Sequence, residues 1–147
     1  MHPVLEADWL GACRRAADGL RAVLAEAPTT AERVRRTGET GGGGDQTLEI
    51  DRAAEDAVFA ELARLHEEGH DFCAVSEERG VVEFGGSEVR VVIDPIDGST
   101  NAMRGLTHHA LSIAVADGPT MADVAFGYVL DLGPEEEWWA HRGQGAF

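Results

Sequence analysis

Residues 89–101 read Val-Arg-Val-Val-Ile-Asp-Pro-Ile-Asp-Gly-Ser-Thr-Asn. The first half of this stretch is a β-branched run, which predicts a buried strand. Two aspartates, Asp94 and Asp97, follow at the end of that strand. An ionised carboxylate costs several kcal/mol to bury unless a cation or hydrogen bonds compensate it. The segment therefore predicts a core strand that ends at a cation site.

The spacing of the two aspartates suits a magnesium ion. Pro95 fixes the backbone so that Asp94 and Asp97 converge, and Ile96 offers its carbonyl between them. Ligands that are all oxygen suit Mg²⁺, whose other positions are filled by water and by a substrate phosphate. The alternative interpretation is structural: an Asp-Pro turn at a strand end, in which an aspartate side chain caps the backbone.

Gly98, Ser99 and Thr100 predict the beginning of a helix directly after the second aspartate. Free backbone amides and the positive end of a helix dipole receive anions, and phosphate is the natural candidate. The chain has no lysine, which excludes a Schiff-base lysine and a P-loop lysine. Metal carboxylates beside an anion site indicate metal-assisted phosphoryl hydrolysis, with metal-bound water as the nucleophile.

Two further acidic groups are candidates for the same site. Glu77 and Glu78 follow an apolar run over residues 72–75, so they reach the same edge of a predicted sheet and are placed to bridge a second metal. Asp51 is the third candidate. The alternative for the Glu-Glu pair is a solvated loop, because charge runs usually face solvent.

The flanking sequence predicts an α+β fold. Apolar residues recur at helical spacing over residues 4–27 and 47–68, and Gly69 suits the cap of the second helix. Residues 37–47 hold five glycines and predict a loop. Short β-branched or aromatic runs predict strands over residues 72–75, 81–84, 89–93, 110–116, 124–130 and 138–141. Two helices followed by strands favour separate helix and sheet layers.

Composition narrows the class of protein. A length of 147 residues suggests one domain, and 12 basic against 27 acidic residues give a net charge of −15. This charge repels phosphate backbones and anionic membranes, so no nucleic acid and no membrane are expected as partners. Cys13 and Cys73 predict buried, reduced thiols and no disulfide framework. Without a targeting or membrane-spanning segment, the expected location is cytoplasmic.

Five ordered blocks resemble the inositol monophosphatase family, including its archaeal-type fructose-1,6-bisphosphatase branch. They are Ser76-Glu77-Glu78, Asp94-Pro-Ile-Asp97-Gly-Ser-Thr-Asn101, Leu111-Ser-Ile-Ala114, Gly127-Tyr-Val129 and Gly143-Gln-Gly-Ala-Phe147. The resemblance implies a layered α+β, sugar-phosphatase-like fold, in which two N-terminal helices pack on a largely antiparallel sheet. It also implies a homodimer.

The resemblance implies a role for each matching residue. Two or more Mg²⁺ ions are implied, with the metal ligands Glu77, Asp94, Asp97 and the carbonyl of Ile96. The implied catalytic residues are Asp51, Glu77 and Ser99, in which Asp51 and the Ser99 hydroxyl orient the attacking water. The implied substrate-binding residues, which hold the phosphate, are Asp97, Gly98, Ser99 and Thr100.

The function implied is Mg²⁺-dependent hydrolysis of a small sugar or polyol phosphate, such as inositol 1-phosphate or fructose 1,6-bisphosphate. One departure lies before Asp51, where the family shows an Asp-Gly-Thr-Pro-Thr-like run and this chain reads Asp45-Gln-Thr-Leu-Glu-Ile. Residues 1–147 match only the N-terminal part of a family domain, and the C-terminal half with its Trp-Asp block is expected to be absent. The alternatives are a truncated or non-catalytic homologue and a 3′-phosphoadenosine 5′-phosphate phosphatase.

Four other features receive structural interpretations. His108 and His109 are expected in an exposed turn, and Arg104 is expected to be solvated. Adjacent tryptophans on a strand point to opposite faces, so one of Trp138 and Trp139 is predicted to be in the core. Residues 135–137, three glutamates in a row, predict a solvated hairpin tip.

Overall fold

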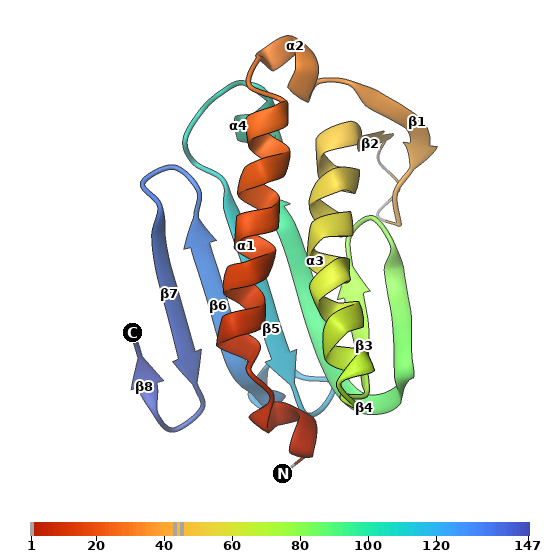
Figure 1. Cartoon of the computed structure of the whole chain (residues 1–147), viewed down its shortest axis with the longest axis vertical. Helices are drawn as coiled ribbons and strands as arrows, with labels where there is room; N and C mark the ends of the chain where they lie inside the picture. The colour runs from red at the N-terminus through yellow and green to blue at the C-terminus, as the bar shows by residue number, and fades with distance from the viewer. Residues whose placement is uncertain (1, 43, 45) are drawn as a thin grey trace.

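Six strands form one sheet in the order β3-β4-β5-β6-β7-β8. The structure is a computed structural model that describes residues 2–42, 44 and 46–147 (Figure 1). From β4 to β8 each neighbouring pair is antiparallel, while β3 runs parallel to residues 90–93 of β4. The predicted α+β fold with a largely antiparallel sheet is confirmed. The strands β3 to β8 span Phe72–Ser76, Gly80–Asp97, Ala110–Ala116, Val124–Asp131, Glu136–His141 and Gly145–Ala146.

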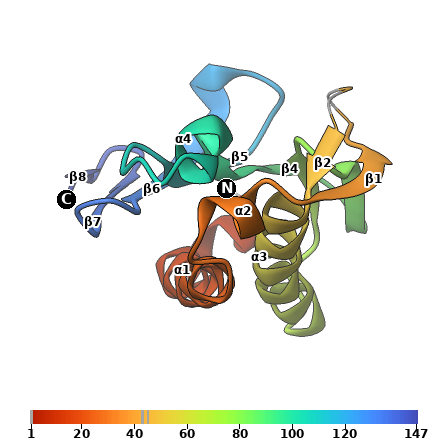
Figure 2. The same cartoon turned by 90° about the horizontal axis from the view of Figure 1, so that it is seen from above.

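Two long helices cover one face of this sheet. They are α1 (Trp9–Glu26) and α3 (Glu49–Glu67), and they lie side by side (Figure 2). Their apolar faces pack against strand side chains such as Phe72. The rings of Phe72 and Trp9 meet edge to face, with their centroids 5.6 Å apart. The indole N–H of Trp9 donates to the carbonyl of Val4 at 2.8 Å, so the polar atom of this buried ring is satisfied. Cys13 and Cys73 are free and buried, as predicted.

The helices begin later than the periodicity predicts. The side chain of Asp8 accepts a hydrogen bond from the N–H of Gly11 at 2.9 Å and caps α1 there. A separate 3₁₀ turn, Pro3–Glu6, precedes it. After α3 ends, Gly69 has a φ of +97°, so the predicted C-terminal glycine is in place. No helix in the described part of the chain has the length and hydrophobicity needed to cross a membrane.

β4 corrects the prediction of two separate strands at 81–84 and 89–93. It is one long strand that bends back at Gly85 and Gly86, whose φ angles are +80° and +70°. Positive φ angles of this size strain any residue with a Cβ, so this bend favours glycine at both positions. β3 therefore pairs with both limbs of β4, with residues 80–84 and with residues 90–93.

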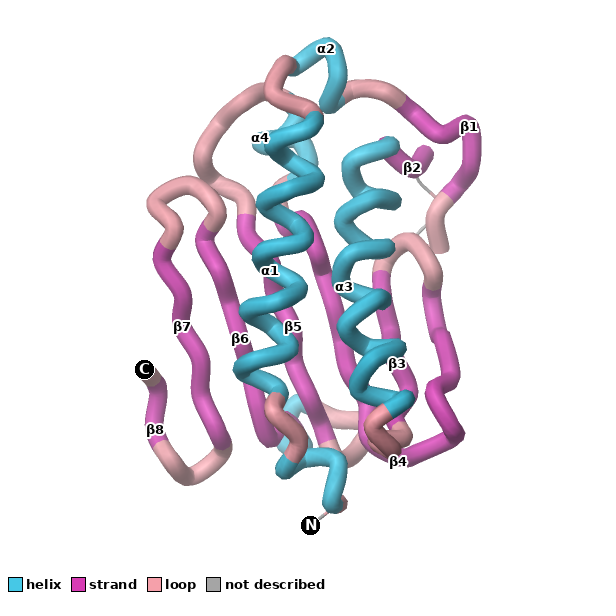
Figure 3. Tube along the Cα trace, in the orientation of Figure 1, coloured by secondary structure: helices cyan, strands magenta, loops and turns pink. Residues whose placement is uncertain are grey.

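The glycine-rich segment is the second correction. A loop was predicted over residues 37–47, but β1 (Arg36–Thr40) and β2 (Gln46–Leu48) form a two-stranded hairpin beside α3 (Figure 3). Residues 43 and 45 of that segment lie outside the described residues. A short helix, α2 (Thr30–Arg33), was not predicted, although Thr29 and Glu32 form a capping box at its start.

The face of the sheet opposite the helices carries exposed apolar side chains. Val92, Val129 and Trp138 are 48%, 39% and 48% exposed. Trp139 points the other way and packs against the core, and its ring stacks on that of Phe147 with the centroids 4.6 Å apart. The predicted opposite orientation of the two tryptophans is therefore confirmed.

The turn between β6 and β7 is solvated as predicted, since Glu135 and Glu136 are exposed, but two of its glutamates are also paired with arginines. Glu135 accepts a hydrogen bond from Arg21 at 2.7 Å, and Glu137 accepts one from Arg14 at 3.0 Å. Tyr128 also donates to Glu137, at 3.0 Å. The expected solvated tip is therefore tied to α1 by arginines that the sequence pattern did not connect with it.

The close contact between α1 and α3 gives a stability prediction. A Cβ at Gly19 would lie 3.1 Å from the Cβ of Ala57 on the facing helix. Gly19→Leu is therefore expected to force the helices apart and lower the free energy of unfolding by about 1–3 kcal/mol, measured by urea denaturation. Ala22→Leu adds the same side chain on the exposed face of α1 and is the matched control. Equal stability of the two variants would contradict this packing.

Candidate active site

Carboxylates from three parts of the fold converge on one hollow. It lies where α3 begins, where β3 turns into β4, and where β4 runs into the short helix α4 (Ser99–Met103), at one end of the sheet (Figure 1). The predicted site residues Asp51, Glu77, Asp94, Ile96 and Ser99 all line it. Asp97, Gly98 and Thr100 lie just beyond this lining, and the side chain of Asp97 is exposed. The full lining is Asp51, Glu55, Glu77, Glu78, Asp94, Pro95, Ile96 and Ser99.

The end of β4 holds its aspartates in place through buried neighbours. Ile96 is 3% exposed and anchors the segment between Asp94 and Asp97 in the core. Gly98 then takes a φ of +94°, and a Cβ there would lie 2.7 Å from the carbonyl oxygen of His108. Only glycine fits this close approach, which turns the chain from the strand into α4. The polar residues therefore follow a rigid strand end.

Ser99 joins the end of β4 to the first turn of α3. Its hydroxyl lies 3.2 Å from Oδ1 of Asp51 and 3.0 Å from the carbonyl oxygen of Ile96, and it is positioned to donate to either. Asp51 and Ser99 are separated by 48 residues in sequence. The fold thus brings together the two residues to which the family resemblance assigns the attacking water.

The two adjacent glutamates differ in their surroundings. Glu78 accepts a hydrogen bond from the hydroxyl of Thr47 on β2, and its backbone N–H donates to Glu55 at 3.3 Å. Its carbonyl accepts from the N–H of Gly42 at 3.0 Å. Glu77 is exposed at the mouth of the hollow. Glu78 is thus held by hydrogen bonds within the protein, whereas Glu77 is more exposed and its charge acts on Asp51 and Asp94.

The carboxylates in this hollow oppose one another's ionisation. Burial raises the pKa of Asp51 to about 6, and the negative charges of Glu78, Glu77 and Asp94 add to the rise, while the Ser99 hydrogen bond opposes it. Burial likewise raises the pKa of Asp94 to about 6, with Glu77 and Asp97 contributing. A cation bound here would offset both the cost of burying the carboxylates and the repulsion between them.

The donor set fits a hard divalent cation. Every charged side chain that lines the hollow is a carboxylate, and the carbonyl of Ile96 is a further oxygen donor. Among the described residues, no group of three or more His, Cys, Asp or Glu side chains is already arranged to hold a metal ion. The fit therefore rests on oxygen chemistry and on the raised pKa values of Asp51 and Asp94.

Residues 5–147 match the model of the inositol monophosphatase family. The chain belongs to this family. It is 40% identical over 107 residues to inositol-1-monophosphatase of Mesorhizobium japonicum, a match that covers 72% of this chain and 38% of that protein. It is also 37% identical to Nus factor SuhB of Escherichia coli K12, over 99% of this chain and 50% of that protein.

Solved structures of the family share the fold. An inositol monophosphatase-fructose 1,6 bisphosphatase superposes with a TM-score of 0.75 at 26% identity, covering 95% of this chain and 52% of that one. The chain therefore spans about half the length, or less, of the relatives it matches. The resemblance seen in the five sequence blocks is confirmed at the level of family and fold.

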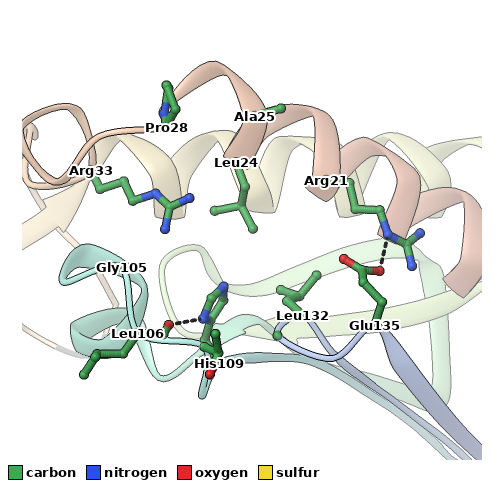
Figure 4. A pocket seen from close by; sticks show the side chains of 12 residues that line it. Arg21, Leu24, Ala25, Pro28, Arg33, Gly105, Leu106, His109, Leu132 and Glu135 are labelled. Atoms are coloured by element: carbon green, nitrogen blue, oxygen red, sulfur yellow. Dashed lines mark hydrogen bonds and ion pairs between the residues drawn. The ribbon is translucent and has the colours of Figure 1, made fainter.

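The histidine pair is exposed at His108, as predicted, but not at His109. His109 is buried, not exposed, and its Nδ1 lies 3.0 Å from the carbonyl oxygen of Leu106. It lines a separate hollow of about 490 Å³ between α1 and the segment after α4 (Figure 4). Arg33 faces the same hollow, and its guanidinium donates to the carbonyls of Ala27 and Ala102 at 2.7 and 2.9 Å. Arg104 is exposed, as predicted.

The sequence analysis missed Glu55 and Thr47 as residues of this region. Both are buried, at 1% and 2% exposure. Glu55 is one helical turn after Asp51, so a signal was present: carboxylates at positions i and i+4 share a helix face. Thr47 carries no comparable signal, because its contact depends on a hairpin that the glycine-rich composition does not predict.

The raised pKa of Asp94 gives a pH prediction. Its folded-state pKa of about 6 exceeds the ordinary value of 3.8, so protonated Asp94 stabilises the fold below pH 3.8, and this stability is lost as pH rises through 6. Without divalent cations, Asp94→Asn should therefore raise the free energy of unfolding at pH 7.5, by about 1 kcal/mol after allowing for partial exposure.

Urea denaturation in EDTA at pH 7.5 and pH 4 measures this difference. The advantage of the asparagine variant should disappear at the lower pH, because Asp94 of the wild type is then protonated in the folded state. A variant that is less stable than wild type at pH 7.5 would show that Asp94 is not under electrostatic stress.

Proposed function

We propose that the protein hydrolyses the phosphate monoester of a small sugar or polyol, with Mg²⁺ as cofactor. The observation that supports this most strongly is the convergence of Asp51, Glu77 and Asp94 on one hollow. Ser99 also lines this hollow and hydrogen-bonds to Asp51. Inositol 1-phosphate and fructose 1,6-bisphosphate are the first candidate substrates, because relatives carry these names.

Each group of residues has a distinct part in the proposed reaction. Glu77, Asp94, Asp97 and the carbonyl of Ile96 hold Mg²⁺, which when bound supplies positive charge to the phosphoryl oxygens. The backbone amides of Gly98, Ser99 and Thr100 receive the phosphate, and Asp97 faces it. This chain covers about half of the matched relatives. In a protein of their full length, residues outside the matched half are expected to complete the site.

Asp51 and Ser99 act on the attacking water in the proposed reaction. The Ser99 hydroxyl is within hydrogen-bond distance of Asp51, at 3.2 Å, and we propose that the two together orient a water for in-line attack on phosphorus. A carboxylate whose pKa is raised to about 6 accepts a proton from that water more readily than an ordinary aspartate does.

Release of inorganic phosphate from inositol 1-phosphate and fructose 1,6-bisphosphate, by the protein at its natural length, tests this function. Release is expected with Mg²⁺ and is expected to stop with EDTA. No release from either substrate under both conditions would contradict the proposal.

Asp97 provides a sharper test. Asp97→Asn keeps the size of an exposed side chain but removes a proposed ligand charge, so the fold should survive while Mg²⁺-dependent phosphate release falls about 100-fold. Glu26→Gln, an exposed neutralisation at the end of α1, is the matched control and should retain activity. Full activity of the Asp97 variant would remove Asp97 from the mechanism.

A second candidate follows from other relatives. The 37% identity to a protein named Nus factor SuhB extends over 99% of this chain. A role of that kind would keep the fold and act through a macromolecular partner, and it is the outcome favoured if no phosphate ester is hydrolysed. The absence of nucleic acid among its partners and the homodimer stay predictions.

A further inference from the structure

Glu55 is the one buried carboxylate among the residues that the structure describes. It is 1% exposed and lies on α3, one turn after Asp51. Burying a carboxylate is costly, and it is retained where fixed partners compensate it. The partners of Glu55 therefore indicate its role.

All of those partners come from one short turn. The backbone N–H of Glu78 donates to Oε1 of Glu55 at 3.3 Å. Burial raises the pKa of the Glu55 carboxyl, and the nearby Ser76 side chain opposes that rise. Nε of Arg79 lies 3.3 Å from Oε2. Ser76 also accepts a hydrogen bond from the backbone N–H of Arg79, at 3.2 Å. A single buried carboxylate thus gathers the residues on both sides of Glu77.

Arg79 has contacts other than the one to Glu55. Its guanidinium pairs with Asp56 at the surface and lies 4.3 Å from the ring centroid of Phe59. Within the described structure, Oε2 of Glu55 has no hydrogen-bond partner despite the nearby Arg79. The hydrogen bond from the Glu78 N–H is therefore the contact by which Glu55 fixes the turn, and it does not require the ion pair.

We propose that Glu55 is a positioning residue: it holds the 76–79 turn against α3 so that Glu77 faces Asp94 and Asp51 in the geometry that a divalent cation needs. Glu55 itself does not touch the cation. This inference rests on the proposed function, because Glu77 must be a ligand for its position to matter. Because Asp51 and Glu55 share one helix face, α3 sets the positions of both α4 and the Glu77 turn.

The test is Mg²⁺ binding to the protein at its natural length, measured by titration calorimetry. Glu55→Ala should raise the Kd for Mg²⁺ tenfold or more, as is usual when a partner that orients a metal ligand is removed. Its kcat should recover at saturating Mg²⁺, because Glu77 is still present. A merely destabilised protein would lose activity at every Mg²⁺ concentration.

Two variants separate the contacts. Glu55→Gln keeps an oxygen that accepts the Glu78 N–H, so its Kd should stay within about threefold of wild type. Asp56→Asn removes the other carboxylate partner of Arg79 and should leave the Kd unchanged. The inference is overturned if Glu55→Ala binds Mg²⁺ like wild type, if the glutamine variant is as weak as the alanine variant, or if Asp56→Asn weakens binding equally.

If Glu55→Ala does not fold, Ser76→Ala loosens the same turn, because it removes the hydroxyl that accepts a hydrogen bond from the backbone N–H of Arg79. It should remain folded and bind Mg²⁺ about threefold more weakly, and an unchanged Kd would overturn the inference. A wild type that neither binds Mg²⁺ nor releases phosphate overturns the proposed function and this inference together. A wild type that does both, with an unaffected Glu55→Ala, overturns this inference alone.

Discussion

The repulsion among carboxylates at one end of the sheet is the constraint on which the site depends. Asp51, Glu77 and Asp94 come from segments far apart in the sequence, and folding forces their charges together. The fold accepts this because packing elsewhere is extensive: the two long helices and one sheet face share a continuous apolar core. The stability of that core is what allows the protein to keep an electrostatically unfavourable hollow.

α3 links the core to the chemistry. One face of this helix carries Ile50, Ala54 and Val58 into the core, while Asp51 and Glu55 project toward the site. A helix held along its whole length by packing positions its polar residues more firmly than a loop does. The contacts to Ser99 and to the 76–79 turn then extend this order to the neighbouring segments.

The sequence predicted the parts of the structure that depend on local pattern. The strand before Asp94 and the amphipathic faces of both long helices follow from side-chain periodicity, and Gly69 follows from the geometry of a helix end.

The features that the sequence did not predict depend on pairing between segments that are distant in sequence. Gly85 and Gly86 look like a break between strands, but both limbs of β4 pair with β3, so the ladder continues through the bend. The hairpin around the glycine run forms because residue 36 pairs with Leu48, which local composition does not reveal. The burial of Glu55 was not predicted, since it depends on the turn that packs over it.

Thermal unfolding of the protein with and without Mg²⁺, at pH 7.5 and at pH 4.5, tests the central claim most directly. If a cation relieves the repulsion in the hollow, Mg²⁺ should raise the Tm at pH 7.5, beyond the effect of NaCl at the same ionic strength. The rise should largely vanish at pH 4.5, where the raised pKa values of about 6 leave Asp51 and Asp94 protonated. A Tm that Mg²⁺ and NaCl change equally at pH 7.5 would contradict the account.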